Sequence, residues 1–130
     1  MVGLVQTITA DEILLMNRRL IEEHGGLGVG LLNPGTLEYA LEEIQGSLFG
    51  APRCPTLHDK AAALGWRIIR GHIFVDGNKR TGMMAAMALL RLNGIALEAS
   101  VQEYVDVALA IASGKATRDD FADFLRAHSR

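Results

Sequence analysis

Residues 79–92, KRTGMMAAMALLRL, form the segment that decides the fold of this chain. The segment is rich in Ala, Leu and Met, which are strong helix formers, and it holds no proline. Its apolar side chains occur almost all round the helical projection, as in a helix enclosed by others. We therefore predict a helix from Lys79 to Leu92 at the centre of a small bundle, ended by Asn93 and Gly94. Its methionines are interpreted as core packing, because their flexible side chains fill irregular gaps.

Capping signals mark the other helices. A Ser or Thr followed three residues later by an acidic residue is typical of a helix start, and each such pair here precedes apolar residues at helical spacing. The predicted helices run from Thr9 to His24, from Pro34 (capped by Asn33) to about Ile44, from Thr56 to Gly71, from Ser100 to about Ser113, and onward from Thr117. The pattern predicts an all-α fold, a compact bundle of about six helices, in one domain over residues 1–130.

Three connecting segments separate these helices. The glycine-rich stretch from Gly25 to Gly30 favours a chain reversal over a phosphate cradle, because no strand precedes it and no P-loop lysine follows. Residues 46–55 are predicted to form a loop, since they include two prolines. Residues 95–99 are expected to be a short extended connection.

Composition excludes several classes of function. The 130 residues carry 22% charged side chains and a net charge of −2, without the basic patch of a nucleic-acid binder. Cys54 is the single cysteine, which rules out an internal disulfide and argues against a cysteine-ligated zinc site. The longest apolar run, 83–90, is too short to span a bilayer, and the first residues do not resemble a signal peptide. We expect a cytoplasmic protein with no membrane and no direct nucleic-acid partner.

The segment HIFVDGNKRTG, residues 72–82, carries the candidate chemistry. Gly77, Asn78 and Lys79 stand at the predicted helix start, where backbone N–H groups lack intrahelical partners and attract anions. Lys79 and Arg80 add positive charge there, and Arg80 can grip phosphate oxygens in a bidentate manner. Asp76 supplies an oxygen ligand of the kind that Mg²⁺ uses together with phosphates. These features together indicate a triphosphate site.

His72 is the candidate general base of this site, since a neutral imidazole can accept a proton from an attacking hydroxyl. Phe74 alternates with His72 and Asp76, so its ring is expected to anchor the loop in the core. Each residue taken alone has an ordinary explanation, such as a turn aspartate or a solvated cation pair. Cations at a helix start oppose the helix dipole, which favours an anion between them. On the residues alone, a phosphate-binding enzyme and a purely structural turn remain alternatives.

The chain resembles the Fic/Doc family, and within it the death-on-curing (Doc) toxin branch. The family signature H-x-F-x-D/E-G/A-N-G/K-R is matched from His72 to Arg80. The GGLG stretch at Gly25, the Asn-Pro-Gly at Asn33, the RGHIF entry at Arg70 and the chain length are similar as well. The resemblance implies the Fic/Doc fold, with His72 as the general base, Asp76 as the Mg²⁺ ligand and Arg80 as the phosphate-gripping residue. It also implies that Gly77, Asn78, Lys79 and Arg80 bind the nucleotide.

Two departures from the adenylylating members concern the reaction. Those members carry glycine at the position of Lys79 and a second arginine at the position of Met83. A lysine here should disfavour the pose that presents the α-phosphate of ATP. Doc toxins share this lysine and act as kinases of a threonine in elongation factor Tu, which stops protein synthesis. The resemblance therefore implies a toxin kinase using ATP and Mg²⁺, with adenylylation as the alternative reaction.

Regulation is expected to come from a second chain. The inhibitory S/T-x-x-x-A/E-G-N helix of self-inhibited Fic proteins is missing, because the single Gly-Asn pair of the sequence is Gly77-Asn78. Resemblance to Doc implies a type II toxin–antitoxin module with a Phd-like antitoxin, which docks in a hydrophobic groove between helices. A non-catalytic helical binding module that retains the motif as scaffold is a further alternative.

Overall fold

The computed structural model describes residues 5–48, 51–52 and 54–130. Its elements are α1 (Ala10–His24), α2 (Pro34–Gln45), β1 (Ser47–Leu48), β2 (Ala51–Pro52), α3 (Leu57–Arg70), α4 (Asn78–Leu92), α5 (Val101–Ala112) and α6 (Arg118–Ala127). The predicted all-α fold is confirmed, with six helices in the described part of the chain. The short antiparallel pair β1–β2 lies where a plain loop was predicted, and the rest of that loop includes residues outside the described ranges.

Helix starts follow the predicted capping chemistry. Capping boxes with both hydrogen bonds in place begin α1, α3, α5 and α6, at Thr9, Thr56, Ser100 and Thr117. The prediction for α2 is wrong in one respect. Asn33 occupies the cap position, yet its side chain makes no cap hydrogen bond, because its amide donates instead to the carbonyls of Gly71 and His72. That amide ties the start of α2 to the segment before α4.

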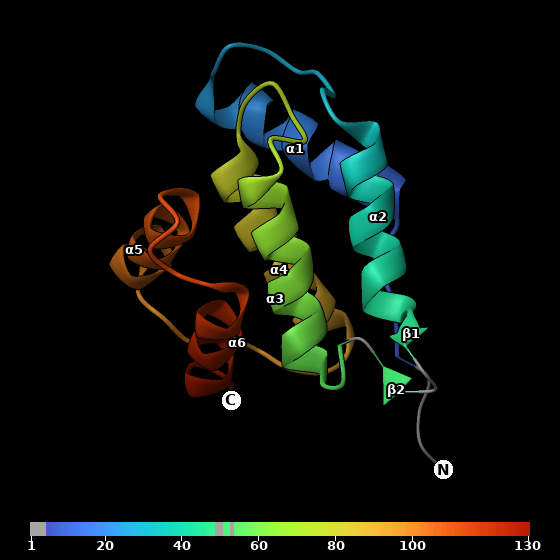
Figure 1. Cartoon of the computed structure of the whole chain (residues 1–130). Coiled ribbons are helices and arrows are strands. Elements are labelled where there is room, and N and C mark those ends of the chain that lie inside the picture. Colours follow the sequence, from blue (N-terminus) through green and yellow to red (C-terminus); the bar gives the residue numbers. More distant parts are fainter. Residues whose placement is uncertain (1–4, 49–50, 53) are drawn as a thin grey trace.

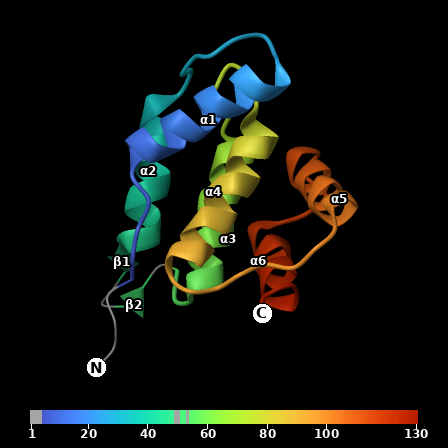
Figure 2. The ribbon, with the colours of Figure 1, turned by 180° about the vertical axis from the view of Figure 1, so that it is seen from behind.

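The helices are arranged around an α3–α4 pair (Figures 1 and 2). α1 and α2 lie on one side of this pair, and α5 and α6 lie on the other. The largest fully buried side chains come from every helix: Ile13, Ile44, Leu64, Ile68, Leu89, Leu90, Ile111, Phe121 and Leu125. The extended segment 95–99 is confirmed, since Leu97 pairs with Ser129 and joins the chain after α4 to the end of the chain after α6.

Two facing glycines allow α3 and α4 to approach closely. A Cβ at Gly65 would lie 2.8 Å from the Gly82 carbonyl oxygen and 2.8 Å from the Phe121 ring. A Cβ at Gly82 would lie 2.7 Å from the Gly65 carbonyl oxygen and 2.6 Å from Cγ1 of Ile69. These separations are far below a van der Waals contact. The bare backbone at both positions therefore sets the spacing of the central helix pair.

α4 is less enclosed than its sequence predicted. Met83 is buried, but Met84 and Leu92 are 41% and 49% exposed, so the prediction of a helix enclosed on all sides is wrong. Met84 is exposed because a hollow between α1 and α5 runs along α4, and Met84 and Met87 help to line it. The methionines thus belong partly to a groove and only partly to the core.

A buried carboxylate links the helices α2, α3 and α6. Glu43 of α2 is 4% exposed and pairs with Arg67 of α3 at 3.3 Å and Arg118 of α6 at 3.1 Å. A buried carboxylate is tolerated in the interior here because two cations offset its loss of hydration.

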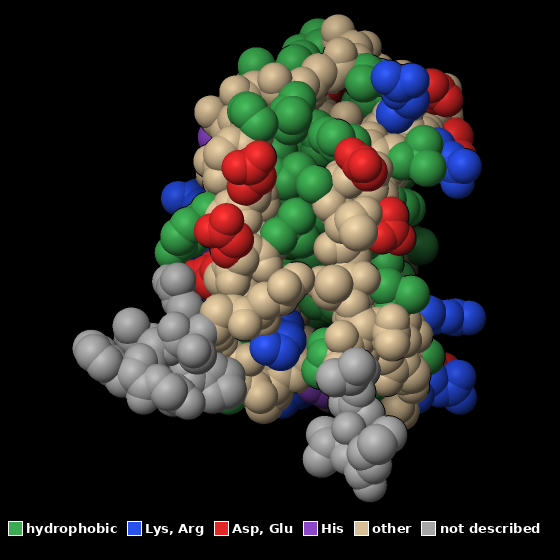
Figure 3. All heavy atoms as spheres, turned by 90° about the vertical axis from the view of Figure 1, so that its right-hand side faces the viewer, with side chains coloured by type: hydrophobic (Ala, Val, Ile, Leu, Met, Phe, Trp, Pro, Cys, Tyr) green, Lys and Arg blue, Asp and Glu red, His purple; other side chains and the backbone are tan. Residues whose placement is uncertain are grey.

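The surface over α2 carries acidic side chains around a hydrophobic strip (Figure 3). None of the helices in the described part of the chain could cross a membrane.

We predict that Gly65→Ala destabilises the protein by about 1–3 kcal/mol, the usual range for overpacking a tight contact. The added methyl group must push α4 and the Phe121 ring away from α3. Chemical denaturation monitored by circular dichroism measures the effect.

Gly35→Ala is the matched control, because nothing lies within 4 Å of a Cβ at that position in α2. It should be neutral or stabilising by up to about 1 kcal/mol, as for other glycine-to-alanine changes in helices. Equal stability of the Gly65→Ala protein and the wild type would refute the close-packing account of the α3–α4 pair.

Candidate functional site

Residues 71–77, between α3 and α4, form the motif loop. It is held against the connection between α1 and α2, residues 25–33, called the glycine loop (Figure 1). Leu31 and Phe74 form an antiparallel bridge, and Val75 donates its N–H to the Gly30 carbonyl at 3.0 Å. A short strand-like ladder thus fixes two loops that are distant in sequence.

Bare glycine backbone makes this approach possible. A Cβ at Gly30 would lie 2.7 Å from Cγ2 of Val75, and a Cβ at Gly26 would lie 2.5 Å from Oδ2 of Asp76. The glycine loop was predicted to be a simple chain reversal, and the structure adds a second role. It packs its backbone directly on the motif loop, where side chains would not fit.

Phe74 and Asn78 stabilise the conformation of the motif loop. Phe74 is buried, as predicted from its alternation with His72 and Asp76. The Asn78 side chain accepts the Phe74 N–H at 2.9 Å and donates to the Phe74 carbonyl at 2.9 Å. Both functional groups of the Asn78 amide are therefore occupied within the loop. The Asn78 side chain is thus fixed by the loop, while its backbone N–H lies among the free donors of the helix start.

Gly77 stands at the cap position of α4 in the left-handed conformation, with φ of 78° and no side-chain cap. Glycine adopts this conformation without the penalty that a Cβ imposes. The first intrahelical hydrogen bond of α4 runs from the Thr81 N–H to the Gly77 carbonyl at 2.9 Å. The N–H groups of residues 78–80 precede that bond, so the N-terminus of α4 keeps the donors that bind anions in other proteins.

The Asp76 carboxylate is held by two backbone donors. Oδ2 accepts the Leu27 N–H at 2.8 Å, and Oδ1 accepts the Gly77 N–H at 2.7 Å. These hydrogen bonds, first that from Leu27 and then that from Gly77, lower the pKa of Asp76, and Lys79 and Arg80 add a smaller effect in the same direction. The carboxylate is consequently charged and fixed in orientation at neutral pH.

His72 is exposed and adopts an unusual backbone conformation. Its φ of 46° makes it the one non-glycine residue with positive φ in the described ranges. A positive φ is uncommon outside glycine, and histidine is among the residues that adopt it most readily. The Asn33 amide donates to the His72 carbonyl at 2.8 Å. The residue predicted to be the base thus has a positive-φ backbone conformation, which the hydrogen bond from Asn33 supports.

The predicted site residues meet in one cavity of about 310 Å³, the motif cavity. Its lining includes His72, Asp76, Gly77, Asn78, Lys79 and Arg80. Arg70 lies there too and was not predicted as a site residue. Its guanidinium donates to the Ala112 carbonyl at 3.1 Å, which fixes the cation beside the cavity. Nothing in the sequence pattern marked this contact, because it depends on where α5 ends.

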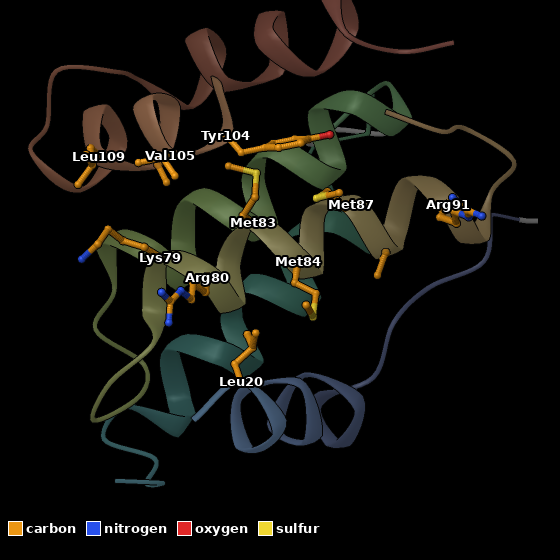
Figure 4. Close-up of a pocket in the computed structure, with 12 residues that line it drawn as sticks. Leu20, Lys79, Arg80, Met83, Met84, Met87, Arg91, Tyr104, Val105 and Leu109 are labelled. Carbon is orange, nitrogen blue, oxygen red and sulfur yellow. The ribbon is translucent and has the colours of Figure 1, made fainter. Parts of the chain in front are cut away.

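A larger groove of about 620 Å³ adjoins the site along α4. Figure 4 shows Leu20 on one side of the groove and Tyr104, Val105 and Leu109 on the other, with the α4 methionines between them. Lys79 and Arg80 line both this groove and the smaller cavity. A molecule seated in the groove would therefore meet the same cations as a ligand at the motif loop.

Metal ligands in the described part of the chain are sparse. No group of three or more His, Cys, Asp or Glu side chains is placed to hold an ion together. Asp76 is the carboxylate of the motif cavity. A single carboxylate suits Mg²⁺, which often takes its remaining ligands from water and substrate phosphates. The donor set therefore fits a magnesium–nucleotide complex better than a resident metal ion.

Comparison with known proteins agrees with this geometry. The sequence profile described as the Fic/DOC family matches residues 7–90. The chain is 41% identical over 93 residues to a protein of Mycolicibacterium smegmatis named Toxin Doc, covering 72% of this chain and 70% of that protein. It is 31% identical over 119 residues to the protein kinase doc of Escherichia phage P1, covering 92% of each. The matched region holds the glycine loop, the motif loop and most of α4, and the chain therefore belongs to the Fic/Doc family.

Proposed function

We propose that this chain is the toxin of a type II toxin–antitoxin module and acts as a protein kinase. It transfers the γ-phosphate of ATP to a threonine hydroxyl of elongation factor Tu and thereby blocks protein synthesis in the cytoplasm. One observation carries the proposal: an exposed histidine, a charged carboxylate and the N-terminus of α4 with its two cations line one cavity. The names of the two relatives, a toxin and a protein kinase, support it.

The nucleotide phosphates bind at the N-terminus of α4 in this proposal. Backbone N–H groups there supply fixed donors, and the Arg80 guanidinium can grip two phosphate oxygens. Asp76, held charged by Leu27 and Gly77, would hold the magnesium ion. When bound, the ion neutralises charge on the phosphates and fixes their orientation. Most of the rate enhancement in phosphoryl transfer comes from such positioning.

His72 accepts the proton of the attacking threonine hydroxyl. As the bond from the threonine oxygen to the γ-phosphorus forms, the bond from that phosphorus to the β–γ bridging oxygen breaks, and ADP leaves. The hydroxyl proton passes to the imidazole. The side chain of His72 is exposed at the cavity, where a protein substrate can reach it.

Lys79 selects the reacting phosphate. Its side chain lines the motif cavity and is exposed, so it adds both bulk and charge beside the bound phosphates. A glycine at this position would leave room for the pose that presents the α-phosphate. The lysine therefore favours phosphorylation over adenylylation.

The antitoxin occupies the groove along α4. The groove is lined mainly by apolar side chains, with Lys79 and Arg80 at one end and Arg91 at the other (Figure 4). An amphipathic segment of a Phd-like partner, with acidic residues to meet these cations, has matching chemistry. Because Lys79 and Arg80 are shared with the motif cavity, such a segment would compete with nucleotide binding.

Labelled ATP tests the reaction directly. Incubation of the protein and elongation factor Tu with γ-labelled ATP should label the factor, whereas α-labelled ATP should not. Label from the α-phosphate alone would replace the kinase proposal with adenylylation. Lys79→Gly is the companion variant, and it should shift transfer toward the α-label. An unchanged label pattern in that variant would refute the role given to Lys79.

Replacement of His72 tests catalysis against simple binding. His72→Ala should lower the transfer rate by about 10²- to 10⁴-fold, the usual contribution of a general base, without loss of the fold. His72→Asn is a second variant, because asparagine tolerates positive φ better than alanine. Growth arrest on expression and radiolabel transfer are the two measurements.

His24→Ala is the control for the histidine variants, since this exposed residue lies outside both cavities and should leave transfer unchanged. Undiminished growth arrest by both His72 variants would instead favour a non-catalytic module that sequesters its partner.

A charge placed in the groove tests the antitoxin surface. Leu109→Lys should weaken antitoxin binding by at least about tenfold, because it buries a charge in an apolar contact, while kinase activity is retained. Val101→Lys is the matched control, since it lies on the same helix, is 79% exposed and does not line the groove. Isothermal titration calorimetry measures both. Equal antitoxin affinity of the two variants would place the antitoxin elsewhere.

A further inference from the structure

Asn17 of α1 is a buried polar side chain that lies outside the signature of the family. It is 1% exposed and lies in the middle of its helix. Its amide nitrogen donates to the Asp76 carbonyl at 2.8 Å and to the Thr81 hydroxyl at 3.1 Å. Both N–H bonds of one buried amide are thus directed at the first turn of α4 and at the carbonyl two residues before that helix.

The contact with Asp76 fixes a peptide plane. In a trans peptide the carbonyl and the following N–H point in opposite directions, and no cis peptide occurs among the described residues. Because the Asp76 carbonyl points to Asn17, the Gly77 N–H points away from α1. That N–H donates to Oδ1 of Asp76 at 2.7 Å. The orientation of one peptide group therefore couples the buried amide to the carboxylate.

The contact with Thr81 fixes the first turn of α4. Thr81 is fully buried, and its N–H makes the first intrahelical bond to the Gly77 carbonyl. Asn17 therefore holds a residue on each side of Gly77. A Cβ at Gly77 would lie 3.2 Å from the Asn17 amide nitrogen, so the cap residue and the amide are also in close contact.

We propose that Asn17 is a positioning residue for the metal and phosphate site. It makes no contact with a ligand itself. By holding the Asp76–Gly77 peptide and the first turn of α4, it sets the direction of the Asp76 carboxylate and of the N–H groups beside it. Removal of its two donors frees that peptide to rotate, and the carboxylate then loses the Gly77 hydrogen bond that orients it.

Two variants remove the donors with little change of shape. Asn17→Asp replaces the NH₂ group, with its two donors, by an oxygen that carries at most one proton, so at least one of the two hydrogen bonds is lost. Asn17→Leu removes all polar character, keeps the same branched four-atom side-chain shape and is a good helix former. Ile44→Val, at the far end of α2, is the control for a small general loss of stability.

The measurement compares the affinity for the β,γ-methylene analogue of ATP with and without Mg²⁺ by isothermal titration calorimetry. Both Asn17 variants should lose about 10- to 100-fold of the affinity gained from Mg²⁺, as for other residues that orient a metal ligand. Affinity without Mg²⁺ depends on the phosphate-binding N–H groups and not on Asp76, so it should fall by a smaller factor. Ile44→Val should match the wild type in both conditions. Amide exchange followed by NMR should show faster exchange of the Gly77 N–H in the Asn17 variants.

Because Asp76 is a magnesium ligand only under the function proposed above, the wild type separates two failures. Wild-type affinity that does not depend on Mg²⁺ would overturn the proposed metal role, and the positioning role of Asn17 with it. Normal Mg²⁺ dependence in the wild type together with unchanged dependence in both Asn17 variants would overturn the role of Asn17 alone.

Discussion

The Asp76 carboxylate, held by the backbone N–H groups of Leu27 and Gly77, is the interaction on which the rest of the site depends. It requires the glycine loop to lie directly on the motif loop, which Gly26 and Gly30 permit by lacking side chains. It also requires Gly77, the cap residue before α4, to adopt the left-handed conformation. The α3–α4 pair supplies the rigid support, since its glycine contact leaves little freedom between the two helices.

Local signals in the sequence predicted most of the fold. Capping boxes depend on residues three apart, so the starts of α1, α3, α5 and α6 could be read directly from the chain. The meeting of His72, Asp76 and Arg80 in one cavity also followed from a short segment around one helix start. Their candidate roles followed from side-chain chemistry, and the family resemblance favoured these roles over an ordinary turn, which each residue alone would also suit.

Features that depend on contacts between distant segments could not be predicted in this way. The Asn33 amide caps no helix because Gly71 and His72 present carbonyls to it across the fold. The exposure of Met84 depends on where α5 lies, which periodicity within α4 does not reveal. Asn17 is separated by 59 residues from the carbonyl that it holds. In the sequence, the local sign is that Asn17 shares the helical spacing of the apolar residues Ile13 and Leu20, where a polar side chain is unusual.

The motif cavity and the groove share Lys79 and Arg80, so one pair of cations would serve both the proposed nucleotide and the proposed antitoxin segment. The central claim is that the N-terminus of α4 binds magnesium and nucleotide phosphates. A crystal structure with Mg²⁺ and a non-hydrolysable ATP analogue tests it most directly. We expect phosphates at the N–H groups that begin α4 and a metal ion on Asp76. Phosphates bound elsewhere on the protein, or a metal ion that does not contact Asp76, would contradict it.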